Sequence, residues 1–141
     1  MQYSSDVVVA VEPALVHPYV ADLSRYVEWM PMVHGADPVG DGVWNVELRA
    51  KVGVFARSKR LRMKRTVNTP QRIVFERDEI DGRRHAPWIM AVALHGTDVG
   101  CDVTVDLSYG GTLWTAGILD RVLAAQVEAG KTGLARVVHG A

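Results

Sequence analysis

The sequence contains a single cysteine, Cys101, so no internal disulfide bond can form. It also has no net charge, because sixteen Lys and Arg residues balance sixteen Asp and Glu residues. Such a chain has no long-range field to attract DNA or an anionic membrane. Its longest apolar stretches, such as residues 86–94, are far shorter than the ~20 residues that cross a bilayer. With no signal-peptide pattern at the N-terminus, these absences predict a soluble cytoplasmic protein that is not an integral membrane protein.

Motifs for metal, nucleotide or nucleophilic chemistry are also missing. One cysteine cannot form a thiolate cluster, and none of the histidines has a metal-ligand spacing such as HExxH. No Walker or dinucleotide-binding glycine pattern follows a predicted strand, and no serine lies in a recognisable nucleophile motif. The sequence therefore predicts neither a metal site nor a cofactor. The histidines are His17, His34, His85, His95 and His139.

The spacing of apolar residues predicts a strand, two short helical pieces, about six strands and a long helix. Residues 3–11 are rich in β-branched side chains, and helical spacing then runs from Pro13 to Pro31, with a bend expected because of Pro18. The second helical piece has Asp22 or Ser24 as its candidate cap. From residue 33 to 109 the period is two, with turn signals at Gly40 to Gly42, Gly53, Thr69-Pro70, Asp81-Gly82 and Gly96 to Gly100.

After Gly110-Gly111, Thr112 is a candidate cap for the long helix. Its apolar positions follow the helical period at Leu119, Leu123, Val127, Gly130, Leu134 and Val137. At 141 residues the chain has the size of one domain, residues 1–141.

Six of the nine residues in RSKRLRMKR, residues 57–65, are basic. Read with period two, Arg60, Arg62 and Lys64 share one face, while the apolar residues of the run share the other. Carboxylates at Glu76 and Asp78 of the following strand predict cross-strand ion pairs on the polar face. The aromatic residues that would stack on nucleic-acid bases are absent from that face. The run is therefore interpreted as a half-buried strand, and no nucleic-acid partner is expected.

The same alternation places Lys59 and Arg65 on the face of Leu61 and Met63. One interpretation is that both side chains extend from strand ends to solvent. The other is that one of them points into a cavity and binds a carboxylate, phosphate or phenolate oxygen of a ligand. Both interpretations stay open for Arg65, whereas the solvent-facing one is favoured for Lys59.

This order of elements is that of the α+β helix-grip fold, in which a curved antiparallel sheet of about seven strands surrounds a long C-terminal helix, with two short helices after the first strand. The segment VEPALVHPYVADLSRYVEWMP, residues 11–31, resembles the opening of the START-like (SRPBCC) superfamily, particularly its polyketide cyclase/dehydrase and lipid-transport branch. Residues 70–88 and 101–111 resemble the later strands of that family. The resemblance implies a cavity that binds a hydrophobic small molecule. The matching series in the first segment is Asp22, Tyr26, Trp29 and Pro31.

The candidate ligand site is the apolar face that the sheet turns toward the last helix, and the alternative is a filled core. Gly130 favours either empty space or close backbone approach, since a helical glycine costs ~1 kcal/mol relative to alanine. The candidate lining residues are Trp44, Leu48, Met63, Arg65, Phe75, Trp88, Met90, Val92, Leu94 and Tyr109 from the sheet, and Leu123, Val127 and Gly130 from the helix.

Two functions remain open on this sequence. The favoured one is binding of a lipid, isoprenoid or polyketide without catalysis, because few titratable groups converge on the lining. The alternative is a polyketide aromatase/cyclase or dehydrase, in which Arg65 stabilises an enolate and Tyr109 or a histidine moves protons. Apolar residues at Ile89, Ala91 and Ala93, on the opposite side of their strand, also predict a possible homodimer.

Overall fold

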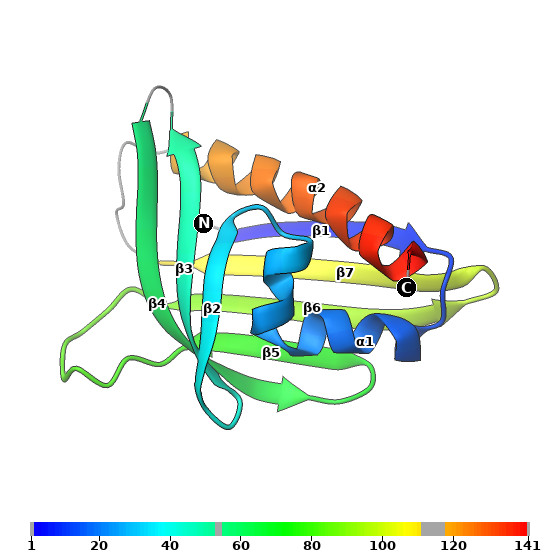
Figure 1. The fold of residues 1–141 in the computed structure, drawn as a ribbon, viewed down its shortest axis with the longest axis horizontal. Coiled ribbons are helices and arrows are strands. Elements are labelled where there is room, and N and C mark those ends of the chain that lie inside the picture. Colours follow the sequence, from blue (N-terminus) through cyan, green and yellow to red (C-terminus); the bar gives the residue numbers. More distant parts are fainter. Residues whose placement is uncertain (1, 53–54, 111–117, 141) are drawn as a thin grey trace.

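A seven-stranded antiparallel sheet with helices on one face forms the molecule (Figure 1). The computed structural model describes residues 2–52, 55–110 and 118–140. The strand order is β1-β7-β6-β5-β4-β3-β2, so the first and last strands pair with each other. This is the predicted α+β helix-grip architecture. The elements are β1 (Gln2–Val9), α1 (Pro13–Ala21), the 3-10 helix η1 (Leu23–Glu28), β2 (Val33–Gly40), β3 (Val43–Val52), β4 (Phe55–Asn68), β5 (Arg72–Arg77), β6 (Trp88–Thr97), β7 (Gly100–Tyr109) and α2 (Ile118–His139).

The two short helices meet at Asp22 rather than at Pro18, where the bend was expected. Pro18 lies inside α1, and Asp22 follows the last residue of that helix. The Asp22 Oδ1 atom accepts a hydrogen bond from the Ser24 backbone N–H at 2.9 Å, which caps η1. The helical region is thus two pieces, as predicted, and the separating residue is the one that supplies the cap.

The basic run lies in β4, an interior strand between β3 and β5, as predicted. Lys64 lies directly opposite Glu76, and Arg62 Nη1 is 3.2 Å from Asp78 Oδ2. On the other side, Arg60 Nε is 4.0 Å from Glu47 Oε1 of β3. Neighbouring carboxylates therefore balance the cations on the outer face of the sheet.

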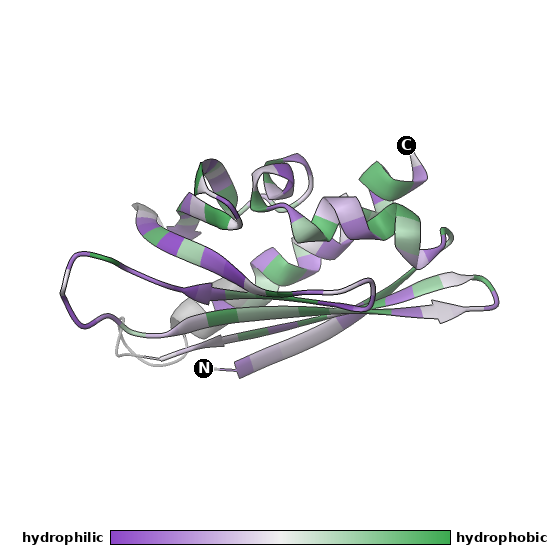
Figure 2. Cartoon of the chain, turned by 90° about the horizontal axis from the view of Figure 1, so that it is seen from below, coloured by the Kyte–Doolittle hydropathy of each residue, from purple (hydrophilic) through white to green (hydrophobic). Residues whose placement is uncertain are grey.

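The C-terminal helix α2 crosses the inner face of the sheet, on the same side as α1 and η1 (Figure 2). Its buried face carries Val127, Gly130, Leu134 and Val138, whereas Val137, which the apolar spacing predicts to be inward, is only partly buried. The burial follows steps of three or four residues to the end of the helix. Thr112, Gly117, Gly53 and the side chains of Leu119 and Leu123 lie outside the described part of the chain.

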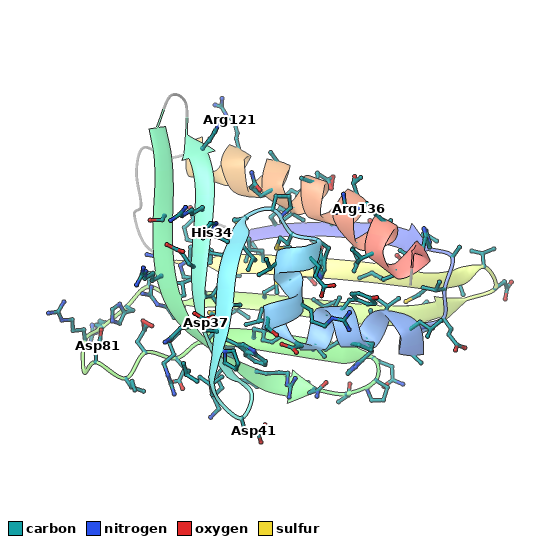
Figure 3. The ribbon with its side chains drawn as sticks, in the orientation of Figure 1. His34, Asp37, Asp41, Asp81, Arg121 and Arg136 are labelled. Carbon is teal, nitrogen blue, oxygen red and sulfur yellow. The ribbon has the colours of Figure 1, made fainter. Side chains whose placement is uncertain are left out.

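Polar contacts fix α2 across β1 and beside η1. Ser5 Oγ on β1 donates to Glu128 Oε2 at 3.1 Å and accepts from Lys131 Nζ at 3.0 Å. Near the C-terminal end, Arg136 Nη2 donates to the Glu28 carbonyl oxygen at 3.5 Å (Figure 3). Among the described residues, no helix is long and apolar enough to cross a membrane.

Candidate functional site

The inner face of the sheet has a packed part, which lies under α1 and η1, and a second part next to the β5–β6 loop, which contains a nearly buried arginine. Its centre is an aromatic cluster that we define as Tyr26, Trp29, Trp44 and Phe75. The Tyr26 ring centroid is 4.4 Å from that of Trp29 and 5.9 Å from that of Phe75, and the centroids of Trp44 and Phe75 are 5.8 Å apart. All four residues are buried. Trp44 and Phe75, two of the candidate lining residues, are therefore packed against other aromatic side chains.

The side-chain polar atoms of Tyr26 and Trp29 have backbone partners. Tyr26 Oη donates to the Val20 carbonyl oxygen at 2.8 Å, and Trp29 Nε1 donates to the Tyr19 carbonyl oxygen at 2.9 Å. Burial raises the pKa of the Tyr26 phenol well above its usual range. This phenol therefore stays neutral and serves as a hydrogen-bond donor that ties η1 to α1.

Arg65 turns its side chain inward, as the alternation predicts. Its Nη1 atom donates to the Ala21 carbonyl oxygen at 2.6 Å, and its guanidinium carbon is 5.5 Å from the Trp44 ring centroid. The carbonyl groups in the last turn of a helix have no partner within the helix, so Arg65 satisfies one of them for α1. Arg65 thus has a structural role in joining β4 to α1, and its contact with a ligand stays a prediction.

Two glycines let α2 approach the connection between η1 and β2. A Cβ atom on Gly130 would lie 3.3 Å from Met30 Cε and 3.6 Å from Trp29 Cζ3. A Cβ atom on Gly133 would overlap the Trp29 carbonyl oxygen and lie 2.9 Å from the Trp29 carbonyl carbon. At Gly130 the space is therefore occupied by the side chains of Met30 and Trp29, and the close approach of backbone occurs at Gly133 instead. Nearby Val127 is buried in the same apolar core.

The second part of the inner face begins with a row of mostly apolar side chains, which crosses the sheet next to the β5–β6 loop. In the register of the strands, Trp44 lies opposite Met63, Met63 opposite Arg77, and Trp88 opposite Tyr109. The Trp88 and Tyr109 rings stack with centroids 5.0 Å apart. Arg77, which the sequence analysis did not select, lies in this row with its side chain only 8% exposed. A nearly buried arginine on the apolar face of a sheet needs an explanation.

Arg77 has three polar contacts, all with the segment that follows β5. Its Nη1 atom donates to the Ala86 carbonyl oxygen at 3.3 Å. Its Nη2 atom lies 3.5 Å from Glu79 Oε2. The same Nη2 atom donates to His85 Nδ1 at 3.2 Å. Among the side chains that the structure describes, two buried N–H donors have no hydrogen-bond partner, namely Arg77 Nε and Trp88 Nε1. We call Lys59, Arg77, Glu79 and His85 the Arg77 cluster.

Lys59 is half-buried within β4. Burial is the main factor that lowers the pKa of Lys59, and the charge of Arg77 lowers it further, whereas Glu79 raises it. The Lys59 side chain is therefore less exposed to solvent than the sequence analysis favoured. Its charge interacts with those of Arg77 and Glu79.

His85 joins the cluster to the β5–β6 loop. Its Nε2 atom lies 2.8 Å from Asp81 Oδ2, and Figure 3 places Asp81 in the loop that extends beyond the sheet. The pKa of the Asp81 carboxyl is lowered mainly by a hydrogen bond from the Arg83 backbone and also by His85. Because Nδ1 accepts from Arg77 and Nε2 donates to Asp81, both ring nitrogens of His85 are engaged.

Two other candidate lining residues retain accessible surface on the inner face. Met90 lies between the buried residues Phe75 and Leu107 in neighbouring strands, and yet it is only partly buried. Leu48, which lies opposite Lys59 in the middle of β3, is also partly buried. The apolar covering of the inner face is thus incomplete toward the Arg77 cluster.

The remaining candidates of β6 lie further along the strand, away from the β5–β6 loop. Val92 and Leu94 are buried in the core. Leu94 also lines an open pocket of about 600 Å³ between α1 and the β4–β5 turn. There His17 Nε2 is 3.0 Å from Asn68 Oδ1 and 3.1 Å from the Thr69 carbonyl oxygen, which closes one side of the pocket.

The outer face of β6 carries Ile89, which is 36% exposed, and Ala93, which is also exposed. None of the described helices covers this face (Figure 2). Self-association through it stays a prediction. Within the described ranges no group of three or more His, Cys, Asp or Glu residues is arranged to hold a metal ion.

No family model and no curated relative matches the chain. Solved structures match it over nearly its whole length. A START superfamily protein from Mycobacterium smegmatis has a TM-score of 0.79 at 14% identity, covering 99% of this chain and 97% of that one. The Zhui aromatase/cyclase from Streptomyces sp. R1128 has a TM-score of 0.67 at 17% identity, covering 99% and 93%. The di-domain ARO/CYC StfQ from the steffimycin biosynthetic pathway has a TM-score of 0.71 at 12% identity, covering 99% and 50%. At these identities the similarity shows the fold.

Proposed function

Because the chain has the START-like, helix-grip fold, we propose that it binds a hydrophobic small molecule between the curved sheet and α2. The ligand class is a lipid, an isoprenoid or a polyketide. The observation that carries this proposal is the incomplete apolar covering of the inner face at Met90 and Leu48, beside the buried row of Met63, Arg77, Trp88 and Tyr109.

The composition of this region suits a small-molecule site. Such sites are mostly apolar and contain a few polar groups that fix the orientation of the ligand. Here Met63, Met90 and Leu48 supply the apolar surface, and the stacked rings of Trp88 and Tyr109 supply a flat wall. We place the ligand here rather than over the aromatic cluster, because the rings of that cluster are already in contact with one another.

A polyketide aromatase/cyclase is the second candidate, because two of the similar structures are aromatase/cyclases. In that function Tyr109 is the candidate acid or base, and Arg77, together with or in place of Arg65, stabilises enolate charge. His85 is a poor candidate base, since its Nδ1 atom already accepts from Arg77 and its Nε2 atom faces Asp81. We therefore favour binding without catalysis.

Native mass spectrometry of the purified protein tests the proposal. We expect a species heavier than the bare chain, whose added mass is released as a hydrophobic small molecule on denaturation. The neutral dye Nile red should bind saturably to protein stripped of that molecule. A bare chain in the native spectrum, together with no saturable Nile red binding, would contradict the proposed function. Conversion of a poly-β-ketone thioester to an aromatic product, abolished by Tyr109→Phe, would instead support the cyclase.

A further inference from the structure

We propose that the ligand carries a carboxylate, and that the Nε–H of Arg77 and the Nε1–H of Trp88 bind this carboxylate at the end of the sheet next to the β5–β6 loop. This inference rests on the proposed function and specifies the chemical class of the ligand. The ligand is then an amphiphile with an anionic head and an apolar body.

Arg77 and Trp88 each carry a buried donor that no described group satisfies. In the part of the chain that the structure describes, four buried side-chain nitrogen or oxygen atoms lack a hydrogen-bond partner. The two nitrogens among them are Arg77 Nε and Trp88 Nε1. Nearly all buried polar groups in folded proteins have partners, so two unpaired donors in one region indicate an acceptor that binds there.

Arg77 and Trp88 lie side by side in the sheet. Glu76 of β5 pairs with Ile89 of β6, so the adjacent residues Arg77 and Trp88 are neighbours across the two strands, both with buried side chains. The hydrogen bond from Arg77 Nη1 to the Ala86 carbonyl oxygen keeps the guanidinium beside the start of β6. Both free groups donate and neither can accept. The occupant must therefore present acceptors, and a carboxylate presents two oxygens.

The charges around Arg77 favour an anion over a neutral ketone or alcohol. Arg77 and Lys59 are two cations that share one carboxylate, Glu79. Glu79 is only partly committed to Arg77, at 3.5 Å, because its Oε1 atom accepts from the Arg62 backbone N–H at 2.7 Å. His85 adds no positive charge to this balance, because its Nδ1 atom accepts from Arg77 while its Nε2 atom donates to Asp81. The inner end of the site thus lacks one negative charge, and a carboxylate on the ligand supplies it.

The probes for this inference are decanoate and decan-1-ol, which share a ten-carbon chain and differ in the head group. Their affinities for stripped protein are measured by displacement of Nile red. We expect the wild-type protein to bind decanoate at least tenfold more tightly than decan-1-ol. A charge-assisted hydrogen bond contributes enough for a preference of roughly 10- to 100-fold.

Three variants test whether Arg77 and Trp88 cause the preference for decanoate over decan-1-ol. Arg77→Gln should weaken decanoate binding roughly 10- to 100-fold and leave decan-1-ol binding nearly unchanged. Trp88→Phe removes the indole N–H but keeps an aromatic ring against Tyr109, and it should weaken decanoate binding about 3- to 10-fold. Arg72→Gln is the matched control, because Arg72 is an exposed arginine on the same strand, and its affinity ratio should equal that of the wild type. If Arg77→Gln does not fold, the loss of decanoate affinity in Trp88→Phe tests the carboxylate site by itself.

The outcomes separate this inference from the proposed function. Equal affinity of the wild-type protein for both probes would overturn the carboxylate assignment and leave hydrophobic binding intact. A preference for decanoate that survives Arg77→Gln and Trp88→Phe would show that the carboxylate binds elsewhere and would also overturn the assignment. Failure of both probes and of Nile red to bind would overturn the inference and the proposed function together.

Discussion

Replacing Gly133 by alanine tests how closely α2 packs on the connection between η1 and β2. The new Cβ atom would overlap the Trp29 carbonyl oxygen and lie 3.1 Å from Trp29 Cα, so backbone must move to admit it. Alanine would add ~1 kcal/mol of helix propensity, whereas overpacking typically costs ~1 to 3 kcal/mol and sometimes more. Because the obstacle is backbone rather than a flexible side chain, we expect the upper end of that cost to prevail. After the gain in helix propensity is subtracted, Gly133→Ala should be destabilised by about 2 kcal/mol, within a range of about 1 to 3 kcal/mol.

Gly130→Ala is the matched control for this prediction. Its Cβ atom would meet Met30 Cε at 3.3 Å, which is the far end of a flexible side chain that can rotate away. The propensity gain and the small steric cost should nearly cancel, within about 1 kcal/mol. Gly130→Leu, in contrast, adds volume against Met30 and Trp29 and should be destabilised by ~1 to 3 kcal/mol.

Thermal unfolding by circular dichroism, with all variants stripped of ligand, measures these effects. For a chain of this length 1 kcal/mol corresponds to roughly 3 to 4 °C in Tm. Gly133→Ala should therefore melt about 3 to 12 °C below the wild type, and Gly130→Ala within a few degrees of it. Equal melting of Gly133→Ala and the wild type would refute direct packing of α2 on Trp29. A rise in Tm for Gly130→Leu would show that open space faces Gly130.

Three further predictions follow from the inner and outer faces of the sheet. Arg65→Met should fold but melt several degrees lower, because it removes a hydrogen bond of about 1.5 to 3 kcal/mol to the Ala21 carbonyl; an unchanged Tm would contradict that role. Arg77→Gln should raise the pKa of Lys59, followed by NMR of ¹³C-dimethylated lysines, since it removes a neighbouring positive charge; a constant pKa would show that the charges do not interact. Because the pKa of Lys59 is lowered in the folded chain, the charged form of Lys59 reduces the free energy of unfolding. This destabilisation is complete below the folded-state pKa of Lys59 and disappears above the ordinary pKa of lysine. DNA should bind only weakly, with a Kd of ~10⁻⁴ to 10⁻⁶ M in fluorescence anisotropy, and submicromolar binding at physiological salt would contradict the neutralised β4 face.

The alternation of apolar residues predicted the series of strands and the inward face of several of them, but not β5, where Ile73, Val74 and Phe75 are all buried. Trp44 and Phe75 point inward as expected, because side chains of a strand alternate between the two faces of a sheet. What the alternation cannot reveal is which inward residues the helices cover. Tyr26 and Trp29 of the η1 region fill the space over Trp44 and Phe75, and this packing depends on contacts between segments far apart in the sequence.

Arg77 illustrates a signal that was present in the sequence but was not used. It lies two residues after Phe75 in β5 and therefore shares the inward face of that strand. The same alternation of faces identified Arg65 and Lys59 in β4 as inward-facing cations. Which of these cations retains an unpaired donor depends on tertiary contacts: the end of α1 provides a carbonyl oxygen for Arg65, whereas Arg77 Nε has no partner.

The most direct test of ligand binding on the inner face is an NMR titration of methionine methyl groups with decanoate. Met63 and Met90 lie on the proposed ligand-binding part of the sheet, and Met30 and Met32 are buried where η1 leads into β2. We predict that the methyl signals of Met63 and Met90 shift with saturation, while those of Met30 and Met32 move little. Shifts confined to Met30 and Met32, or no saturable shift in any of the four, would contradict a ligand site between the sheet and α2.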